Sequence, residues 1–151
     1  MVTPFDIARY EGKWYEMARL DHGFERGLSD VNASYRRQPD GTVQVINRGY
    51  DNSRREWRQA EGRALFVGDP DRGSLKVSFF WPFYSGYHVV ALDQQDYLWS
   101  MVVGPDRDYL WILARDKHLP VDVRERLLSQ AREIGIDTRK LIWTEQTRPD
   151  S

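Results

Sequence analysis

Gly12-Lys13-Trp14-Tyr15-Glu16-Met17-Ala18-Arg19 is the stretch that decides the fold of this chain. It lies near the start of the sequence and joins a glycine to two large aromatic residues and a closing arginine. A second informative stretch lies far downstream, where residues 104–109 read Gly-Pro-Asp-Arg-Asp-Tyr and a strand-like run then ends at Arg115. One Gly-x-Trp tripeptide is weak evidence for any fold, whereas both stretches together, near opposite ends of a 151-residue chain, are strong evidence.

Strand-like runs recur at short intervals along the chain. The links between them are rich in Asp, Asn, Gly and Pro, which favour hairpins and turns. Eight successive strands with short links predict an all-β protein, an antiparallel up-and-down meander that closes into an eight-stranded β-barrel. Closure is favourable because it removes the exposed edges of the sheet. The expected strands span residues 13–20, 31–37, 42–50, 56–67, 74–80, 86–92, 97–103 and 109–115.

A helical pattern follows the last of these strands. Pro120 fits the first turn of a helix, Asp122 is favourable near its positive end, and Gly135 is a stop signal. Its single apolar face must pack on something, and we expect it to pack against the outside of the barrel. A short extra strand at 140–144 and a frayed end at 146–151 complete a single domain spanning 1–151. The apolar face comprises Val123, Leu127, Leu128, Ala131 and Ile134.

The two diagnostic stretches resemble the signature of the lipocalin family. In that family the tryptophan, here Trp14, plugs the closed end of an eight-stranded barrel, and the late arginine, here Arg115, lies across its indole. A guanidinium on an indole face combines a cation–π contact with packing of its apolar stem. The resemblance also implies that the first long loop, residues 21–30, folds over the open end. The structural signature residues are Gly12, Trp14, Tyr15, Arg19, Asp108 and Arg115.

Further segments are similar to the bacterial branch of the lipocalins, the outer-membrane lipoproteins. They lie at residues 20–22, 24–28, 45–50, 75–80 and 104–113, and the resemblance covers residues 5–143. It implies binding and transport of fatty acids or lysophospholipids for membrane lipid maintenance, by a lipoprotein on the periplasmic face of the outer membrane. The lipidated cysteine of that branch is absent here, and Arg107 stands where the family usually has threonine. Either the protein is cytosolic or a leader has been removed, and because the chain begins almost directly at the signature, we expect removal.

Composition narrows the classes of function. The 22 basic and 23 acidic residues give a net charge of -1, which gives no support to a nucleic-acid partner. The absence of cysteine excludes disulfides, thiolate metal sites and cysteine nucleophiles. No run approaches the roughly 18 apolar residues of a membrane-spanning helix. The 6 Trp, 8 Tyr and 6 Phe favour a β-rich binding protein, because aromatic residues suit strands and line apolar cavities.

Strand alternation predicts which side chains face the barrel interior. Every second residue of a barrel strand points inward, and the inward sets, which other lipocalins share, are mostly apolar. A solidly packed interior is the alternative to a ligand cavity, and small inward residues such as Ala33, Ala60 and Ala91 favour the cavity. We expect a lipid headgroup near the mouth, met by tyrosine hydroxyls, Asn47 or an arginine. The predicted ligand-binding residues are Ala33, Tyr35, Val45, Asn47, Arg58, Ala60, Val77, Phe79, Tyr87, Val89, Tyr109 and Trp111.

Residues 79–87 read Phe-Phe-Trp-Pro-Phe-Tyr-Ser-Gly-Tyr, an aromatic stretch where a polar turn is expected. Such a loop either folds over the barrel mouth as a lid or projects as an apolar tip that contacts a bilayer or a second subunit of a homodimer. Four neighbouring aromatic side chains cannot all point into one narrow mouth, so we expect some of them to stay exposed. The four residues are Phe80, Trp81, Phe83 and Tyr84.

Motifs for catalysis are absent from the sequence. It has no Gly-x-Ser-x-Gly elbow, no His-Glu-x-x-His pair and no phosphate-binding loop. His22, His88 and His118 are isolated, and we expect them on the surface or in turns. We therefore predict a lipid-binding protein with no catalytic residues, metal or cofactor. Two other classes stay open: a barrel enzyme acting on a small hydrophobic ligand, and an interaction module that binds a partner through residues 79–87.

Overall fold

A computed structural model describes residues 1–22, 25–80 and 82–149 of the chain. Within these residues the strands form one antiparallel sheet, and pairing between its first two strands in sequence closes eight of them into a barrel. The predicted eight-stranded barrel with one extra strand is therefore confirmed. The strands are β1 (Gly12–Leu20), β2 (Leu28–Arg37), β3 (Val43–Asp51), β4 (Glu56–Phe66), β5 (Ser74–Phe80), β6 (Phe83–Leu92), β7 (Trp99–Val103), β8 (Leu110–Ala114) and β9 (Leu141–Trp143).

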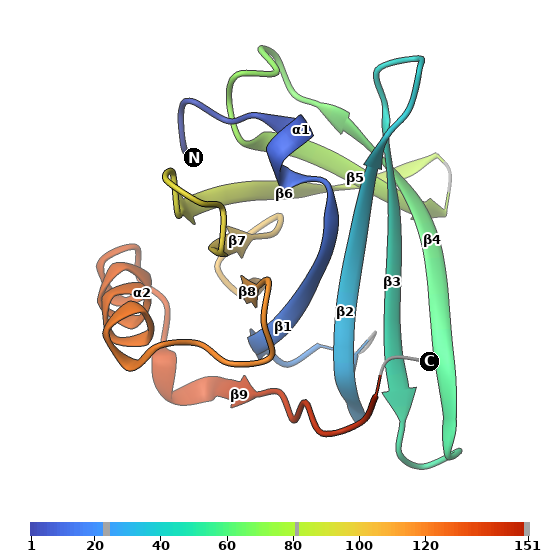
Figure 1. The fold of residues 1–151 in the computed structure, drawn as a ribbon, viewed down its shortest axis with the longest axis vertical. Coiled ribbons are helices and arrows are strands. Elements are labelled where there is room, and N and C mark those ends of the chain that lie inside the picture. The colour runs from blue at the N-terminus through green and yellow to red at the C-terminus, as the bar shows by residue number, and fades with distance from the viewer. Residues whose placement is uncertain (23–24, 81, 150–151) are drawn as a thin grey trace.

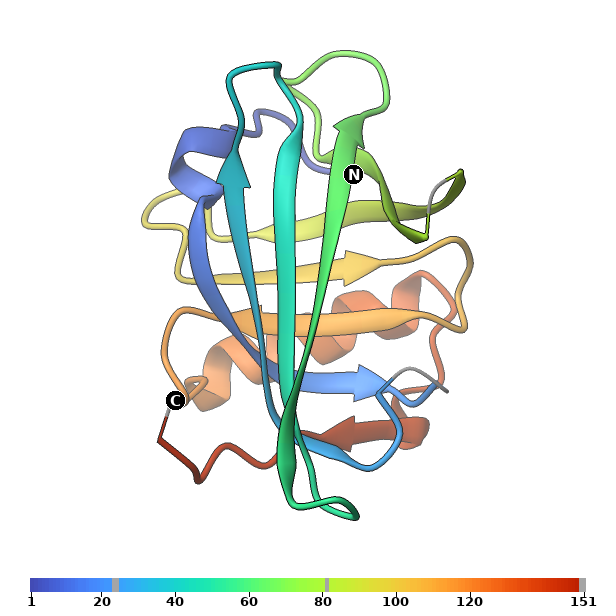
Figure 2. The same cartoon turned by 90° about the vertical axis from the view of Figure 1, so that its right-hand side faces the viewer.

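The barrel has two different ends. β2, β3 and β4 stand upright on one side of it, and β5 to β8 cross behind them (Figure 2). The short helix α1 (Ile7–Tyr10) lies beside the start of β1, at the end we call closed (Figure 1). The sequence analysis missed α1, which begins where the Asp6 carboxylate accepts the Ala8 N–H at 3.0 Å. The loops β1–β2, β3–β4, β5–β6 and β7–β8 lie at the opposite, open end.

A second apolar core lies outside the barrel, beneath the helix α2 (Val121–Glu133). The buried face of α2 packs on Met101, Leu110 and Ile112 of β7 and β8, as predicted. The prediction that Ile134 belongs to the buried face of the helix is wrong. Ile134 is exposed, and Ile136, beyond the turn at Gly135, is buried instead. Gly135 ends the helix at φ +92°, a conformation that favours glycine. No helix in the described part of the chain is long and apolar enough to cross a membrane.

Strand register explains which predicted inward sets hold. β3 and β4 pair without interruption from Val43↔Ala64 to Asp51↔Glu56, so alternation alone places their side chains correctly. The β6–β7 pairing, in contrast, shifts between Val89 and Ala91. One irregular residue moves every later side chain to the opposite face. Ala91 therefore packs in the outer core beneath α2, and its predicted inward position is wrong.

The barrel wall is incomplete between β4 and β5. These strands pair only from Arg63↔Ser78 to Phe66↔Leu75, so β4 continues toward the open end without β5 beside it. A hollow of about 570 Å³ opens where the strands part. The hollow makes the open end wider on this side. It is lined by Glu61, Gly62, Arg63, Ser78, Phe79 and Tyr84.

A C-terminal strap, residues 144–148, closes another part of the wall. β1 pairs with β2 only over Gly12–Tyr15, and from Ala18 onward it pairs with β9. In the gap, the Gln146 side-chain amide donates to the carbonyls of Glu16 at 2.9 Å and Val31 at 2.8 Å. The Asp30 carboxylate accepts the next two backbone N–H groups, both at 2.7 Å. The expectation of a frayed end is therefore wrong for residues 146–148.

Candidate functional site

Trp14 and Arg115 form the closed end as the signature predicts. The Trp14 side chain is fully buried, and its indole N–H donates to the Tyr10 carbonyl at 2.8 Å. The Arg115 guanidinium lies 3.9 Å from the indole centroid. It also donates to the carbonyls of Arg9, Lys13 and Tyr97, so it ties three segments together besides stacking. Gly12 fits this corner because its φ is +99° and a side chain there would meet Arg115 at 3.3 Å.

The other signature residues have different surroundings. Tyr15 points outward, where the ammonium groups of Lys13 and Lys117 lie 5.9 and 5.4 Å from its ring. Asp108 is exposed in the β7–β8 loop, and its N–H donates to the Asp106 carboxylate at 2.8 Å. Arg19, in contrast, is buried within the barrel at the open end.

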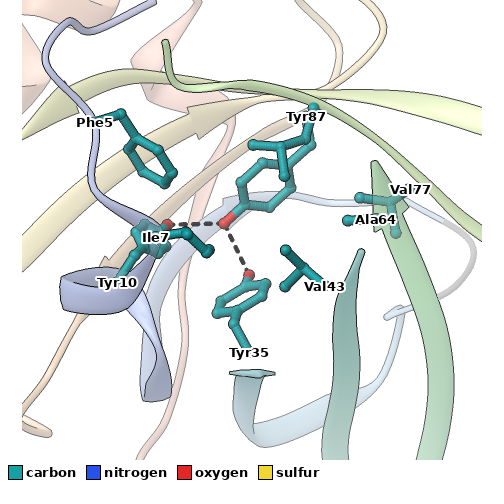
Figure 3. Close-up of a pocket in the computed structure, with 9 residues that line it drawn as sticks. Phe5, Ile7, Tyr10, Tyr35, Val43, Ala64, Val77 and Tyr87 are labelled. Atoms are coloured by element: carbon teal, nitrogen blue, oxygen red, sulfur yellow. Dashed lines mark hydrogen bonds between the residues drawn. The ribbon is translucent and has the colours of Figure 1, made fainter. Parts of the chain in front are cut away.

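Three tyrosine side chains meet above this closed end, inside the barrel (Figure 3). The Tyr87 hydroxyl donates to the Tyr35 hydroxyl at 2.8 Å and lies 2.8 Å from the Tyr10 hydroxyl. Burial raises the pKa of Tyr10 to about 12 and raises those of Tyr35 and Tyr87 well above 10, so all three phenols stay protonated. Their hydroxyls lie at the closed end. The expectation that the hydroxyls of Tyr35 and Tyr87 meet a lipid headgroup at the mouth is therefore wrong.

A small cavity lies beside these tyrosines. Its volume is about 10 Å³, close to the space of one water molecule. The walls are apolar apart from the phenols, and α1 contributes Ile7 and Tyr10 to them. The lining residues are Phe5, Ile7, Tyr10, Tyr35, Val43, Ala64, Leu75, Val77 and Tyr87.

The remaining predicted ligand residues form a wall from this cavity to the mouth. Pairing in register puts Asn47 opposite Ala60 and Gly49 opposite Arg58, on the same face as the buried Val45. Ala60 and Arg58 are exposed, because β5 does not pair with this part of β4, and Arg58 lies 3.8 Å from the Asp51 carboxylate. The apolar members that pack in the interior are Ala33, Val45, Val77, Phe79, Val89 and Trp111.

Tyr109 occupies the mouth, although it lies just before β8 rather than in a strand. Its ring centroid is 5.6 Å from that of His22 and 6.3 Å from that of Trp111. Because His22 belongs to the β1–β2 loop, that loop reaches over the open end, as the resemblance implied. The expectation that His22 is isolated is wrong. Its ring Nε2 lies 3.2 Å from the Glu25 carboxylate.

A buried charged cluster at the open end is the functional feature that sequence reasoning missed. Arg19 contacts the Glu16 carboxylate at 2.9 Å and donates to the Glu25 carbonyl at 2.9 Å. Trp111 donates its indole N–H to the Glu25 carboxylate, also at 2.9 Å. The spacing of Glu16 and Arg19 was a usable signal, since two opposite charges within an otherwise apolar strand imply a buried pair.

The two glutamates of this cluster titrate in opposite directions. Burial, followed by the neighbouring Glu25 carboxylate, raises the pKa of Glu16 well above 4.5. Burial acts on Glu25 in the same direction, but hydrogen bonds from Glu16, His22 and Trp111 outweigh it and lower the pKa of Glu25 to about 2. One guanidinium shared by two buried carboxylates favours protonation of Glu16 before Glu25.

The aromatic stretch is a tight hairpin whose tip is exposed. β5 and β6 extend into it, and Phe80 pairs with Phe83, so the expected loop is mostly strand. The two side chains are 71% and 76% exposed, which confirms that part of the stretch stays outside the barrel. Tyr84 lies on the hairpin arm with the Lys76 ammonium 5.0 Å from its ring centroid. Trp81 lies outside the described residues.

Across the described residues no group of His, Cys, Asp and Glu side chains has the arrangement of a metal site. His88 faces outward, as expected, with its Nδ1 2.6 Å from the Ser74 hydroxyl across the β5–β6 pair. His118 is exposed. What the interior offers is an apolar wall with polar groups at its two ends.

Comparison with known proteins agrees with this architecture. Residues 5–146 match the lipocalin-like domain family. The chain is 51% identical to the outer membrane lipoprotein Blc of Escherichia coli K12 over 146 residues, which are 97% of this chain and 82% of that protein. It is 47% identical to the Blc protein of Vibrio cholerae, with 96% and 85% covered. Among solved structures, the cockroach allergen Per a 4 superposes with a TM-score of 0.77 at 19% identity, covering 97% of this chain and 92% of that one.

Proposed function

Since this chain belongs to the lipocalin-like domain family, we propose that it binds amphipathic lipids, fatty acids or lysophospholipids, inside the barrel and transports them for membrane maintenance. One observation carries the proposal. The interior is an apolar wall that is sealed at one end by Trp14 and open at the other beside Ala60. A protein with this interior binds by burial rather than by reaction, which favours a carrier over an enzyme.

The acyl chain enters from the open end and lies along Val45, Phe79 and Trp111. Each methylene that leaves water contributes about 0.8 kcal/mol, so a long chain supplies the affinity. The headgroup stays at the mouth, where Asn47, Arg58 and Tyr109 offer an amide, a guanidinium and a phenol. Arg58 suits a carboxylate or phosphate because its guanidinium is exposed and held only at 3.8 Å by Asp51.

A pair of neighbouring substitutions on β4 tests this route. Ala60→Trp places an indole on the inner face at the mouth, whereas Gln59→Trp places one on the outer face of the same strand. We expect Ala60→Trp to weaken hexadecanoic acid binding at least tenfold and Gln59→Trp to leave it unchanged, measured by intrinsic fluorescence titration. Both positions are exposed, so neither substitution disturbs the core. Equal affinities in the two variants would place the lipid outside the barrel.

We propose that the protein acts at the outer membrane, on its periplasmic face. The Escherichia coli and Vibrio cholerae relatives are named outer membrane lipoproteins and align over nearly the whole chain. Fractionation of cells that express the protein from its own gene, followed by protease accessibility in spheroplasts, tests this location. Recovery with the inner membrane would contradict it.

The hairpin tip, marked by the paired residues Phe80 and Phe83, is proposed to contact the bilayer. Two adjacent phenyl rings exposed at the open end form an apolar patch that a membrane interface covers well. The patch adjoins the hollow between β4 and β5, so contact there brings the barrel opening to the lipid surface. The second candidate function is that of an interaction module that binds a partner through this tip. A second copy of the chain is the alternative to a bilayer as the surface that covers the patch.

Vesicle flotation distinguishes these occupants. Phe80→Ser with Phe83→Ser should abolish flotation with phosphatidylethanolamine–phosphatidylglycerol vesicles and leave hexadecanoic acid binding within twofold. The matched control is Leu98→Ser with Val121→Ser, which removes two other exposed apolar side chains, 51% and 70% exposed, away from the open end. Loss of lipid binding without loss of flotation would make the tip a lid. If the wild-type protein is a dimer in analytical ultracentrifugation and the Phe80→Ser, Phe83→Ser variant is a monomer, the tip is a subunit interface.

A further inference from the structure

The tyrosine cluster at the closed end has a fixed direction of hydrogen bonding. A phenol has one proton, and Tyr87 donates its proton to Tyr35. The 2.8 Å contact between Tyr10 and Tyr87 therefore requires Tyr10 as the donor. By the same reasoning the 3.2 Å contact of Tyr10 with Ser100 requires the serine as the donor. The order is Ser100 to Tyr10 to Tyr87 to Tyr35.

Tyr35 is thus the end of the series, and its own O–H proton has no acceptor among the residues that the structure describes. The side chain is only 8% exposed, so bulk water does not satisfy this donor. A buried polar group without a partner is unfavourable by roughly 1–3 kcal/mol, and donors in series polarise one another, which strengthens the last one. The cavity that Tyr35 lines is otherwise apolar on every side except for Tyr10 and Tyr87 (Figure 3).

We infer that this cavity is a subsite for a single neutral oxygen, a hydroxyl or carbonyl carried on the buried end of an elongated lipid, and that Tyr35 donates to it. The inference rests on the proposed lipid binding and adds a preference to it. An apolar chain end leaves the Tyr35 donor unpaired, whereas an oxygenated end pairs it. The protein should therefore select acyl chains that carry oxygen at the end remote from the headgroup.

Size and charge restrict the oxygen that fits. A volume of about 10 Å³ admits one oxygen-sized group rather than a ring or a phosphate. No lining residue is charged, so a carboxylate would be buried without a counter-ion. The Arg115 guanidinium stacks on the Trp14 indole and already donates to three carbonyls. A hydroxyl or a carbonyl meets both restrictions.

Matched fatty acids test the preference directly. Hexadecanoic and dodecanoic acid are each titrated against their terminally hydroxylated counterparts, with intrinsic fluorescence as the readout. The wild-type protein should bind the hydroxylated acid roughly 3- to 10-fold more tightly, the range of one net hydrogen bond. Tyr35→Phe with Tyr87→Phe should reduce that ratio to about one, and Tyr35→Phe alone should lower it if the double variant does not fold. Tyr97→Phe, a buried tyrosine outside the series, should keep the wild-type ratio.

The outcomes separate this inference from the proposed function. Binding of neither acid would defeat lipid binding itself. Equal binding of plain and hydroxylated acids by the wild-type protein, or a preference that survives in the Tyr35→Phe, Tyr87→Phe variant, would overturn only the oxygen subsite.

Discussion

Replacing Trp14 by alanine should remove the seal at the closed end of the barrel. The side chain is fully buried, packs 4.7 Å from the Tyr10 ring and 3.9 Å from the Arg115 guanidinium, and donates its N–H to the Tyr10 carbonyl. Truncation of a buried tryptophan lowers the free energy of unfolding by about 3–5 kcal/mol. For a chain of about this length each kcal/mol corresponds to about 2–4 °C in Tm, so Tm should fall by about 6–20 °C.

Trp14→Phe separates the two parts of that loss. Phenylalanine keeps most of the ring packing but leaves the buried Tyr10 carbonyl without its donor, which costs about 1–3 kcal/mol. Urea unfolding followed by circular dichroism gives the free energy of each variant, and the order should be wild type, Trp14→Phe, Trp14→Ala. A Trp14→Ala protein that melts within 2 °C of wild type would refute the reasoning, because a plug cannot be removed without loss of packing.

Four further outcomes follow from contacts described above. Arg115→Lys should lower the free energy of unfolding in urea by about 1–3 kcal/mol, because an ammonium cannot reach all three carbonyls that the guanidinium reaches. An unchanged urea midpoint would contradict this role of Arg115. The stability that protonated Glu16 contributes is fully present below pH 4.5 and is lost as pH rises through its raised folded pKa. Glu16→Gln should therefore remove this part of the decline in wild-type stability above pH 4.5. Glu25 has the opposite sign: the stability it contributes is present above pH 4.5 and is lost as pH falls toward its folded pKa of about 2. In Glu25→Gln, the Tm from thermal melts should therefore depend less on pH in that acid range. Asp30→Ala should free the C-terminal strap, seen as faster hydrogen exchange at residues 144–148, while exchange in α2 stays unchanged.

The fold was largely predictable from sequence because its information is local. Alternation along β3 and β4 placed Val45, Asn47 and Ala60 on the inner face, and the uninterrupted pairing of these strands confirms that placement. The irregularity between Val89 and Ala91 was not predictable, since nothing in Tyr-His-Val-Val-Ala-Leu marks a residue that drops out of register. The family signature predicted the contact between Trp14 and Arg115, which lie about a hundred positions apart in the sequence. Strand alternation cannot predict a contact of this kind.

The candidate site was less predictable because it depends on depth along the barrel. Period-two alternation says that Tyr35 and Tyr87 face inward, but it does not say at which end their hydroxyls lie. The buried cluster of Glu16, Arg19 and Glu25 depends on a loop folding back onto the barrel, and the order of charges in sequence fixes no such path. Residues 146–151 were expected to fray because they are polar, yet the polar groups of Gln146, Thr147 and Arg148 bind them to Glu16, Val31 and Asp30.

The position of the C-terminal strap has a consequence for biosynthesis. The strand β1 is flanked at one end by β9 and by residues 144–148, about 130 positions further along the chain. While those residues are still inside the ribosome or a translocation channel, the Glu16 and Val31 carbonyls lack the Gln146 amide and the wall between β1 and β2 stays open. The barrel therefore completes itself only after residues 144–148 have emerged, and its interior is accessible to lipid during that interval. Nascent chains arrested before Thr144 should accordingly be protease-sensitive until the remaining residues are supplied.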